Sequence, residues 1–214
     1  MSTAIKLTTV EVNDKTGIAT LTMCRPPVNG QNLELLLDIK SSINEIKNNN
    51  SRGLIITSGH APAGGCLLAT ACEYRVMVPN CIIGLNETQL GIIAPKWLVS
   101  GYLNILPKRV AERSLTQGRL FTTDEALQEG LIDEIANSKE EAVDKCVAFI
   151  GTFAKVNPVA RALTKQQFRA DNLRQFHKER EQDVDDFLSL VNRPEVQKGI
   201  AIYLEGLKKK ANKQ

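Results

Sequence analysis

The stretch from Pro62 to Gly91 contains the residues of this sequence whose types and spacing could do chemistry. Within it, the pair Gly64-Gly65 opens an apolar segment of helical character. The first N–H groups of a helix have no intrahelical partner, and the helix dipole favours negative charge beside them. We therefore expect this helix start to present a hydrogen-bond donor to an oxyanion.

Glu87 is the second candidate in the same stretch. It is the only carboxylate residue between Glu73 and Lys96, and Leu85 and Leu90 are close to it in the sequence. If Glu87 is buried among such residues, the loss of hydration disfavours its ionised form and makes it a candidate proton shuttle. The alternative is an ordinary surface carboxylate in a loop.

Two segments of this stretch resemble the crotonase (enoyl-CoA hydratase/isomerase) superfamily, most closely its mitochondrial enoyl-CoA delta-isomerase branch. They are PAGGC at residues 62–66 and GLNETQLGIIAP at residues 84–95, in the order and at the spacing of the family. The resemblance implies an α/β fold: a crotonase-like ββα spiral core, truncated internally, followed by a C-terminal helical region.

The resemblance also implies an enzyme, an isomerase of fatty acid β-oxidation that shifts the 3-enoyl double bond of an acyl-CoA thioester to the 2-trans position. This reaction needs a base that moves a proton from C2 to C4, and donors that hold the enolate oxygen. By position in the family's motifs, Glu87 is the base, Gly64 supplies an oxyanion donor and Asn86 lies against the substrate. Hydratases of the family have a further glutamate where this chain has Leu67, which favours isomerisation. No metal is implied, and no cofactor beyond the coenzyme A of the substrate.

One segment of the family's pattern is missing between Thr57 and Pro62. In the family, the strand matching residues 54–57 leads into an A-G-L-D-L-like loop, helices and a further strand, whereas here residues 58–61 connect directly. That loop provides the family's first oxyanion donor, so we expect a weak catalyst that is marginally stable in isolation. A non-catalytic acyl-CoA-binding subunit is the alternative. His60 lies at the junction, and a lone histidine in a surface loop is more often a bystander.

The composition indicates an ordinary globular protein. The chain has 214 residues, 43% of them hydrophobic, and a formal net charge of +3, which is too small to indicate nucleic-acid binding. Five cysteines without a C-x-x-C pair favour free thiols in a reducing compartment. No segment is long enough to span a membrane, and residues 1–9 lack the arginines of a targeting presequence. A location in the mitochondrial matrix is therefore implied by the family alone.

The hydrophobic pattern predicts the elements around the site. Residues 6–12 and 18–24 are expected to form a hairpin, residues 33–48 a helix and residues 54–56 a buried strand. Further along, we expect helices at 96–106, 108–117 and 125–129, a capping box formed by Thr122 and Glu125, and a strand at 131–135. Trp97 could line a pocket, although a core position is the commoner one.

From Ser138 onward the pattern is helical, with breaks at residues 157–158 and 193–194 and a second capping box at Ser138 and Glu141. Apolar stripes along these helices need a partner. In crotonases such helices pack subunits into trimers, and packing on the chain's own body fits the stripes equally well. We therefore divide the chain into a crotonase-like core, residues 1–136, and a C-terminal helical oligomerisation region, residues 137–214.

Overall fold

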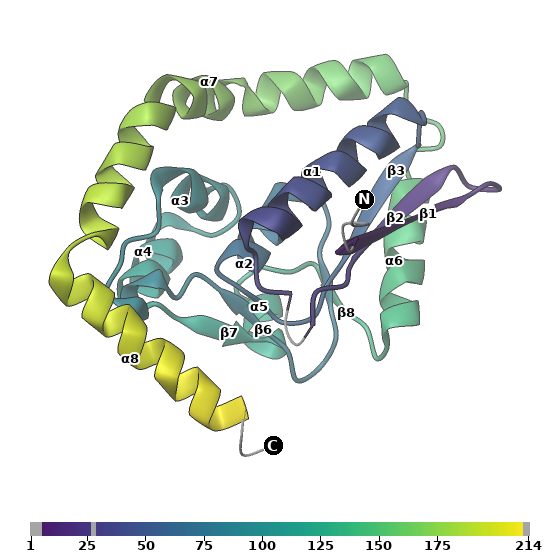
Figure 1. The fold of residues 1–214 in the computed structure, drawn as a ribbon. Coiled ribbons are helices and arrows are strands. Elements are labelled where there is room, and N and C mark those ends of the chain that lie inside the picture. Colours follow the sequence, from purple (N-terminus) through teal and green to yellow (C-terminus); the bar gives the residue numbers. More distant parts are fainter. Residues whose placement is uncertain (1–5, 27–28, 212–214) are drawn as a thin grey trace, which may run out of the picture.

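The computed structural model describes residues 6–26 and 29–211 and contains three small sheets surrounded by helices (Figure 1). In the first sheet, β1 (Thr8–Asn13) pairs antiparallel with β2 (Ile18–Met23), and β2 pairs in parallel with β3 (Gly53–Thr57). The predicted hairpin is confirmed, closed by a bond of 2.7 Å from the Gly17 N–H to the Asn13 carbonyl.

Helix α1 (Leu33–Asn48) forms at the residues that the sequence predicts, and it packs on this sheet. The side chain of Asn32 accepts a hydrogen bond from the N–H of Leu35 and caps the helix. Its buried side chains, Leu35, Ile39 and Ile46, form one cluster with residues of β2. On the same helix, Asp38 accepts hydrogen bonds from the backbone N–H groups of residues 7 and 8, which ties α1 to the start of β1.

The opposite side of α1 is uncovered. Leu33, Leu36 and Leu37 have exposed fractions of 71%, 45% and 55%. An apolar face of this kind is uncommon on a soluble chain and needs a cover or a partner.

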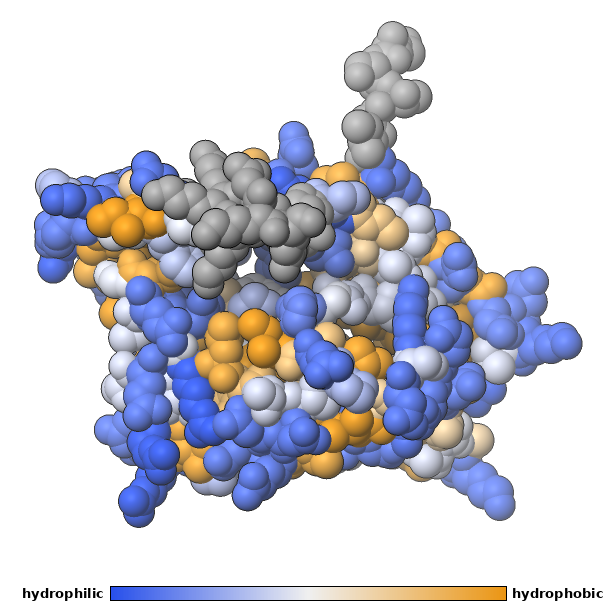
Figure 2. Space-filling model, turned by 90° about the horizontal axis from the view of Figure 1, so that it is seen from below, coloured by the Kyte–Doolittle hydropathy of each residue, from blue (hydrophilic) through white to orange (hydrophobic). Residues whose placement is uncertain are grey.

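Apolar side chains also gather in the middle of the face seen from below in Figure 2, where hydrophilic side chains surround them.

The second sheet positions the candidate site. Strand β4 (Ala61–Pro62) pairs in parallel with β6 (Ile82–Gly84), which pairs antiparallel with β7 (Leu120–Thr122). Helix α2 (Gly64–Ala71) follows β4 directly, as predicted from the glycine pair. A third, two-stranded sheet joins β5 (Val76–Met77) to β8 (Glu134–Ile135).

Three helices complete this half of the chain, namely α3 (Lys96–Leu103), α4 (Lys108–Gln117) and α5 (Thr123–Gln128). The capping box of Thr122 and Glu125 is confirmed.

Two predicted elements are too long. The helix expected at 96–106 ends at Leu103, because the chain turns at Asn104 before Pro107. The strand expected at 131–135 forms only at its last two residues, because the N–H groups of Leu131 and Ile132 bond back to the carbonyl of Ala126.

The C-terminal region is helical throughout its described part: α6 (Lys139–Gly151), α7 (Pro158–Val191) and α8 (Pro194–Ala211). Helix α7 runs along the outside of the molecule and bends around it (Figure 1). Ser138 caps α6 by accepting from the N–H of Glu141, but the Glu141 carboxylate accepts from Asn137 instead of Ser138. The second capping box is therefore only half formed.

The apolar stripe of α6 packs on the chain's own body. Ile150 lies against Gly53, where a Cβ would come within 2.8 Å of its side chain, and Phe149 stacks on Tyr74 with ring centroids 4.4 Å apart. On α7, in contrast, Leu163 and Phe168 have exposed fractions of 59% and 85%. The division of the chain at residue 136 and the trimer both stay predictions. Across the described ranges, no helix is both long and apolar enough to cross a membrane.

Candidate active site

The parallel pairing of β4 with β6 brings the glycine pair and Glu87 to the same edge of the sheet. Pro62 lies opposite Gly84, and the N–H of Ala63 donates to the carbonyl of Gly84 at 2.8 Å. Parallel strands leave a sheet in the same direction, so Gly64 and Glu87, two and three residues beyond this pair, emerge together.

A short 3-10 helix, η1 (Glu87–Leu90), fixes the backbone of Glu87. It ends at Gly91, whose φ of 76° is in the left-handed region that favours glycine. The N–H of Ile92 then returns to the carbonyl of Glu87 at 3.2 Å. The hydrogen bonds from Gly91 and Ile92 to the Glu87 carbonyl therefore close this turn on Glu87.

The carboxylate of Glu87 is buried and has a free oxygen. The residue is 6% exposed, and its Oε2 atom has no hydrogen-bond partner within residues 6–26 and 29–211. Burial raises the pKa of this carboxyl above its ordinary value, and a bond from its own backbone N–H only partly offsets the rise. Such a group is more basic than a surface glutamate and can accept a proton from a bound molecule.

Two other titratable side chains lie in this part of the core, Cys66 on α2 and Tyr102 on α3, and both are fully buried. Burial, followed by the charge of Glu87, raises the pKa of the Cys66 thiol to about 12. Burial also raises the pKa of Tyr102, whose hydroxyl has no partner in the described part of the chain. Both groups are neutral at physiological pH, so they bring no compensating charge to Glu87.

Sequence reasoning missed Tyr102 altogether. The available signal was its position four residues after Leu98, which places both side chains on the same, buried face of α3. Cys66 was noticed only as one of five free thiols.

The start of α2 has the geometry expected of an anion-binding helix end. Ala63 has a φ of 49° and a ψ of −114°, and its carbonyl accepts the first intrahelical bond, from the N–H of Leu67 at 3.0 Å. The N–H groups of Gly64, Gly65 and Cys66 therefore have no partner within the helix. A Cβ at position 64 would overlap the carboxamide of Gln31, which would then have to move.

The remaining residues singled out in the sequence lie around these two groups. Asn86 is 6% exposed and its carbonyl accepts the N–H of Gln89 at 3.0 Å, while the contact of its side chain with a substrate stays a prediction. Leu67 packs against the main hydrophobic core. His60 is exposed, and its Nδ1 atom accepts the N–H of Ile82 at 3.2 Å, which supports the interpretation as a structural bystander.

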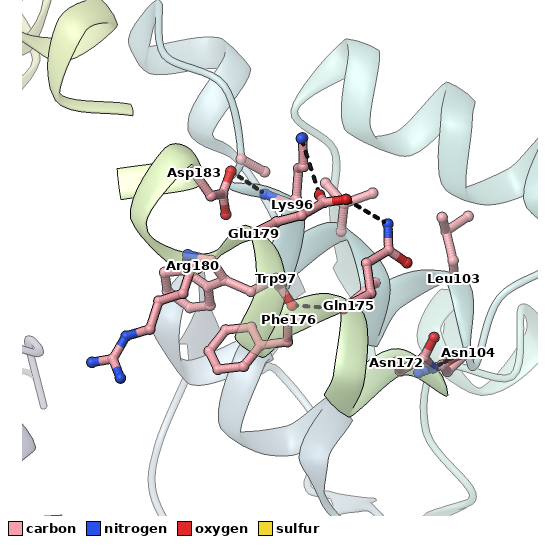
Figure 3. A pocket seen from close by; sticks show the side chains of 13 residues that line it. Lys96, Trp97, Leu103, Asn104, Asn172, Gln175, Phe176, Glu179, Arg180 and Asp183 are labelled. Carbon is pink, nitrogen blue, oxygen red and sulfur yellow. Dashed lines mark hydrogen bonds and ion pairs between the residues drawn. The ribbon is translucent and has the colours of Figure 1, made fainter. Parts of the chain in front are cut away.

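A separate cavity of about 320 Å³ lies between α3 and α7 (Figure 3). Trp97 and Phe176 form part of its wall, so Trp97, 37% exposed, lines a cavity and is not a core residue. Lys96 pairs with Glu179 at its rim, with 3.2 Å between Nζ and Oε2. Gly64, Asn86 and Glu87 do not line this cavity, so we do not assign the chemistry to it. In the ranges described, no group of three or more His, Cys, Asp or Glu side chains could hold a metal ion.

Comparison with known proteins decides the family. The sequence model described as "Enoyl-CoA hydratase/isomerase" matches residues 57–214, nearly three quarters of the chain. The chain belongs to the enoyl-CoA hydratase/isomerase family. Within this family, it is 34% identical over 256 aligned positions to "Enoyl-CoA delta isomerase 1, mitochondrial" of Rattus norvegicus, covering 94% of this chain and 87% of the relative. The human protein of the same name is 32% identical, with coverage of 93% and 83%.

A solved structure of the family has the same fold. The crystal structure of human mitochondrial delta3-delta2-enoyl-CoA isomerase superposes with a TM-score of 0.90 at 32% identity, covering 95% of this chain and 99% of that one. The crotonase fold with a C-terminal helical region is thereby confirmed.

The comparisons also bear on the missing segment. The alignment with the rat relative has 256 positions, more than the 214 residues of this chain, so that family member contains residues absent here. The family match begins at residue 57, the last residue of β3. This is the point at which the sequence predicts the gap.

Proposed function

We propose that this chain is an enoyl-CoA delta-isomerase that shifts the double bond of a 3-enoyl-CoA to the 2-trans position in fatty acid β-oxidation. The observation that supports this most strongly is the buried Oε2 atom of Glu87, which lacks a partner and belongs to a carboxyl of raised pKa. The names of the rat and human relatives support the same reaction.

The proposed mechanism uses one carboxylate and a backbone donor. Glu87 removes a proton from C2 of the bound thioester, and the electron pair of that C–H bond moves into an enolate that extends over C2 to C4. The N–H of Gly64 donates to the enolate oxygen. Glu87 then returns the proton to C4, and the double bond between C2 and C3 remains. The product has the same atoms as the substrate, so no co-reactant is needed.

Leu67 favours isomerisation over hydration. A hydratase of this family would have a second carboxyl group at this position to orient water, whereas Leu67 packs against the core and has no group that could do so. Glu87 is then the one carboxylate of the proposed site. A single carboxylate is sufficient for a proton shuttle.

The setting is proposed from the relatives. Those from rat and human are described as mitochondrial, and we place this chain in the mitochondrial matrix by analogy. We propose no separate cofactor, because coenzyme A is part of the acyl-CoA substrate. We propose a homo-trimer, in which partner subunits cover apolar side chains such as Phe168 on α7.

The test is a direct comparison of two reactions on the purified full chain. We expect conversion of 3-enoyl-CoA to 2-trans-enoyl-CoA, and hydration of 2-enoyl-CoA only at the level of a blank without enzyme. Hydration at a rate equal to or above isomerisation would refute the assignment.

A second function, a non-catalytic acyl-CoA-binding subunit, is favoured by one observation. The chain runs from β3 to β4 through Ser58, Gly59 and His60 alone, without the loop that provides the family's first oxyanion donor. Loss of one such donor typically lowers the rate about 100- to 1000-fold. Tight binding of acyl-CoA with no measurable isomerisation would establish this alternative.

A further inference from the structure

Gln31 lies against the proposed oxyanion donor. The Gln31 Oε1 atom is the atom nearest to a Cβ built on Gly64, followed by Cδ at 2.7 Å and Nε2 at 3.4 Å, so the carboxamide lies directly against Gly64 with its oxygen turned toward it. Gln31 belongs to the loop between β2 and α1, far from Gly64 in sequence. Its side chain reaches the start of α2 from outside that helix.

The loop that positions Gln31 is anchored on both sides. Before it, Arg25 Nη1 donates to the carbonyl of Gly30 at 2.8 Å. After it, Asn32 caps α1, and its N–H donates to the same carbonyl at 3.1 Å. The backbone on both sides of Gln31 is therefore held by hydrogen bonds.

The same loop contacts the junction where the chain is shorter than its relatives. The Nδ2 atom of Asn29 donates to the hydroxyl of Ser58 at 3.3 Å, and the N–H of Arg25 donates to Asn29 Oδ1 at 2.8 Å. Ser58 follows β3, at the start of the direct connection to β4. The Gln31 loop thus lies beside the position from which the longer family members extend their donor loop.

The carboxamide of Gln31 is available for a ligand. Among the residues that the structure describes, it makes no side-chain hydrogen bond, although an amide has two N–H donors and one acceptor oxygen. Glu87, which is 6% exposed and has a free oxygen, follows β6 at the sheet edge where Gly64 follows β4. A backbone donor and a side-chain amide therefore lie side by side at Gly64, at the edge of the sheet from which Glu87 also emerges.

We infer that Gln31 donates a hydrogen bond from Nε2 to the enolate oxygen of the substrate, beside the N–H of Gly64, and so replaces the donor of the missing loop. This inference rests on the proposed isomerase function. Rotation of the carboxamide about its last bond exchanges its oxygen for its NH₂ group, so the donor can face the ligand without a change in the backbone. No covalent bond to Gln31 forms or breaks.

The test compares the full-length parent with Gln31→Leu, which keeps most of the side-chain volume and removes the donors. Gln128→Leu is the matched control, because Gln128 is exposed at the end of α5 and distant in sequence from every site residue. We expect Gln31→Leu to lower kcat for 3-enoyl-CoA isomerisation about 100-fold, the lower end of the loss for one oxyanion donor, with little change in KM.

A second readout does not depend on turnover. Acetoacetyl-CoA forms an enolate that can be followed by its ultraviolet absorbance, and the parent should stabilise this enolate while Gln31→Leu does not. The parent could stabilise the enolate of acetoacetyl-CoA without isomerising 3-enoyl-CoA. If Gln31→Leu then lost the enolate signal, the result would support the role of Gln31 and refute the proposed function. An unchanged kcat and an unchanged enolate signal in Gln31→Leu would refute the inference and leave the function standing. A higher kcat in Gln31→Leu would show that Gln31 obstructs Gly64, which also refutes the inference.

Discussion

The segment from Ala61 to Gly91 and the outer face of α1 differ in how completely the chain covers them. In the first, Glu87 and Cys66 are at most 6% exposed, and the backbone is fixed by the pairing of β4 with β6. In the second, Leu33 and Leu37 are more than half exposed. The chain thus retains the groups that could do chemistry and lacks part of the structure that would surround them.

The difference has a physical origin. A buried carboxylate and a glycine helix start depend on local register and on a few neighbours, which residues 61–91 supply themselves. The apolar face of α1 depends on elements elsewhere in the chain, and the connection through Ser58 to His60 is too short to contain them. The loss of a segment therefore lowers the stability of the chain and exposes the apolar face of α1 more than it changes the arrangement of Glu87 and Gly64.

Insertion of the missing segment should have the largest effect. We would place the residues that the rat relative has in excess between Ser58 and Gly59 and measure the melting temperature and isomerase rate. Each leucine that becomes fully buried contributes roughly 1.5 to 3 kcal/mol, and 1 kcal/mol shifts Tm by about 2–4 °C in a chain of this size. We therefore expect a clear rise in Tm.

The rate in the inserted protein sharpens the comparison further. Because Gln31 already supplies a donor, the gain should stay below the roughly 100- to 1000-fold that one oxyanion donor is worth. Gln31→Leu should then cost little, since the inserted backbone donor replaces the amide. A chain that is already a stable monomer, with a Tm that insertion does not raise, would show that the uncovered face of α1 has no energetic consequence.

Much of the site could be predicted from the sequence, because its residues act locally. The glycine pair predicted the start of α2. The sequence made burial among leucines the condition for the role of Glu87, and the structure meets that condition. The strand and helix order up to residue 57 followed from apolar spacing alone. The roles of Glu87, Gly64 and Asn86 in a reaction stay predictions.

What the sequence did not reveal depends on contacts between distant segments. Gln31 meets Gly64 through a loop that is also bonded to Arg25 and Ser58, and no sequence pattern signals such a contact. The strand expected at residues 131–135 was too long, because its first N–H groups close the end of α5 instead of pairing with a neighbour.

A smaller effect concerns stability and pH. The folded-state pKa of Glu87 is raised, so its contribution to stability is fully present below the ordinary carboxyl pKa and is lost as the pH rises through the raised value. Glu87→Gln cannot ionise, and we expect it to melt at a higher temperature than the parent at neutral pH. The difference should disappear in acid, where the parent carboxyl is protonated in both states. A difference in Tm that is independent of pH would show that burial does not disfavour the ionised form.

The most direct test of the central claim, that Glu87 is the base of an isomerase, is the turnover of 3-enoyl-CoA by Glu87→Gln. Glutamine preserves the volume and hydrogen-bonding capacity of the side chain and removes the basic oxygen. General acid–base catalysis typically contributes about 100- to 10,000-fold to the rate, so the rate of isomerisation should fall at least about 100-fold. Binding of the acyl-CoA, measured on the same protein, should persist. A variant that keeps most of the parent's activity would contradict the claim and assign the proton transfer to another group.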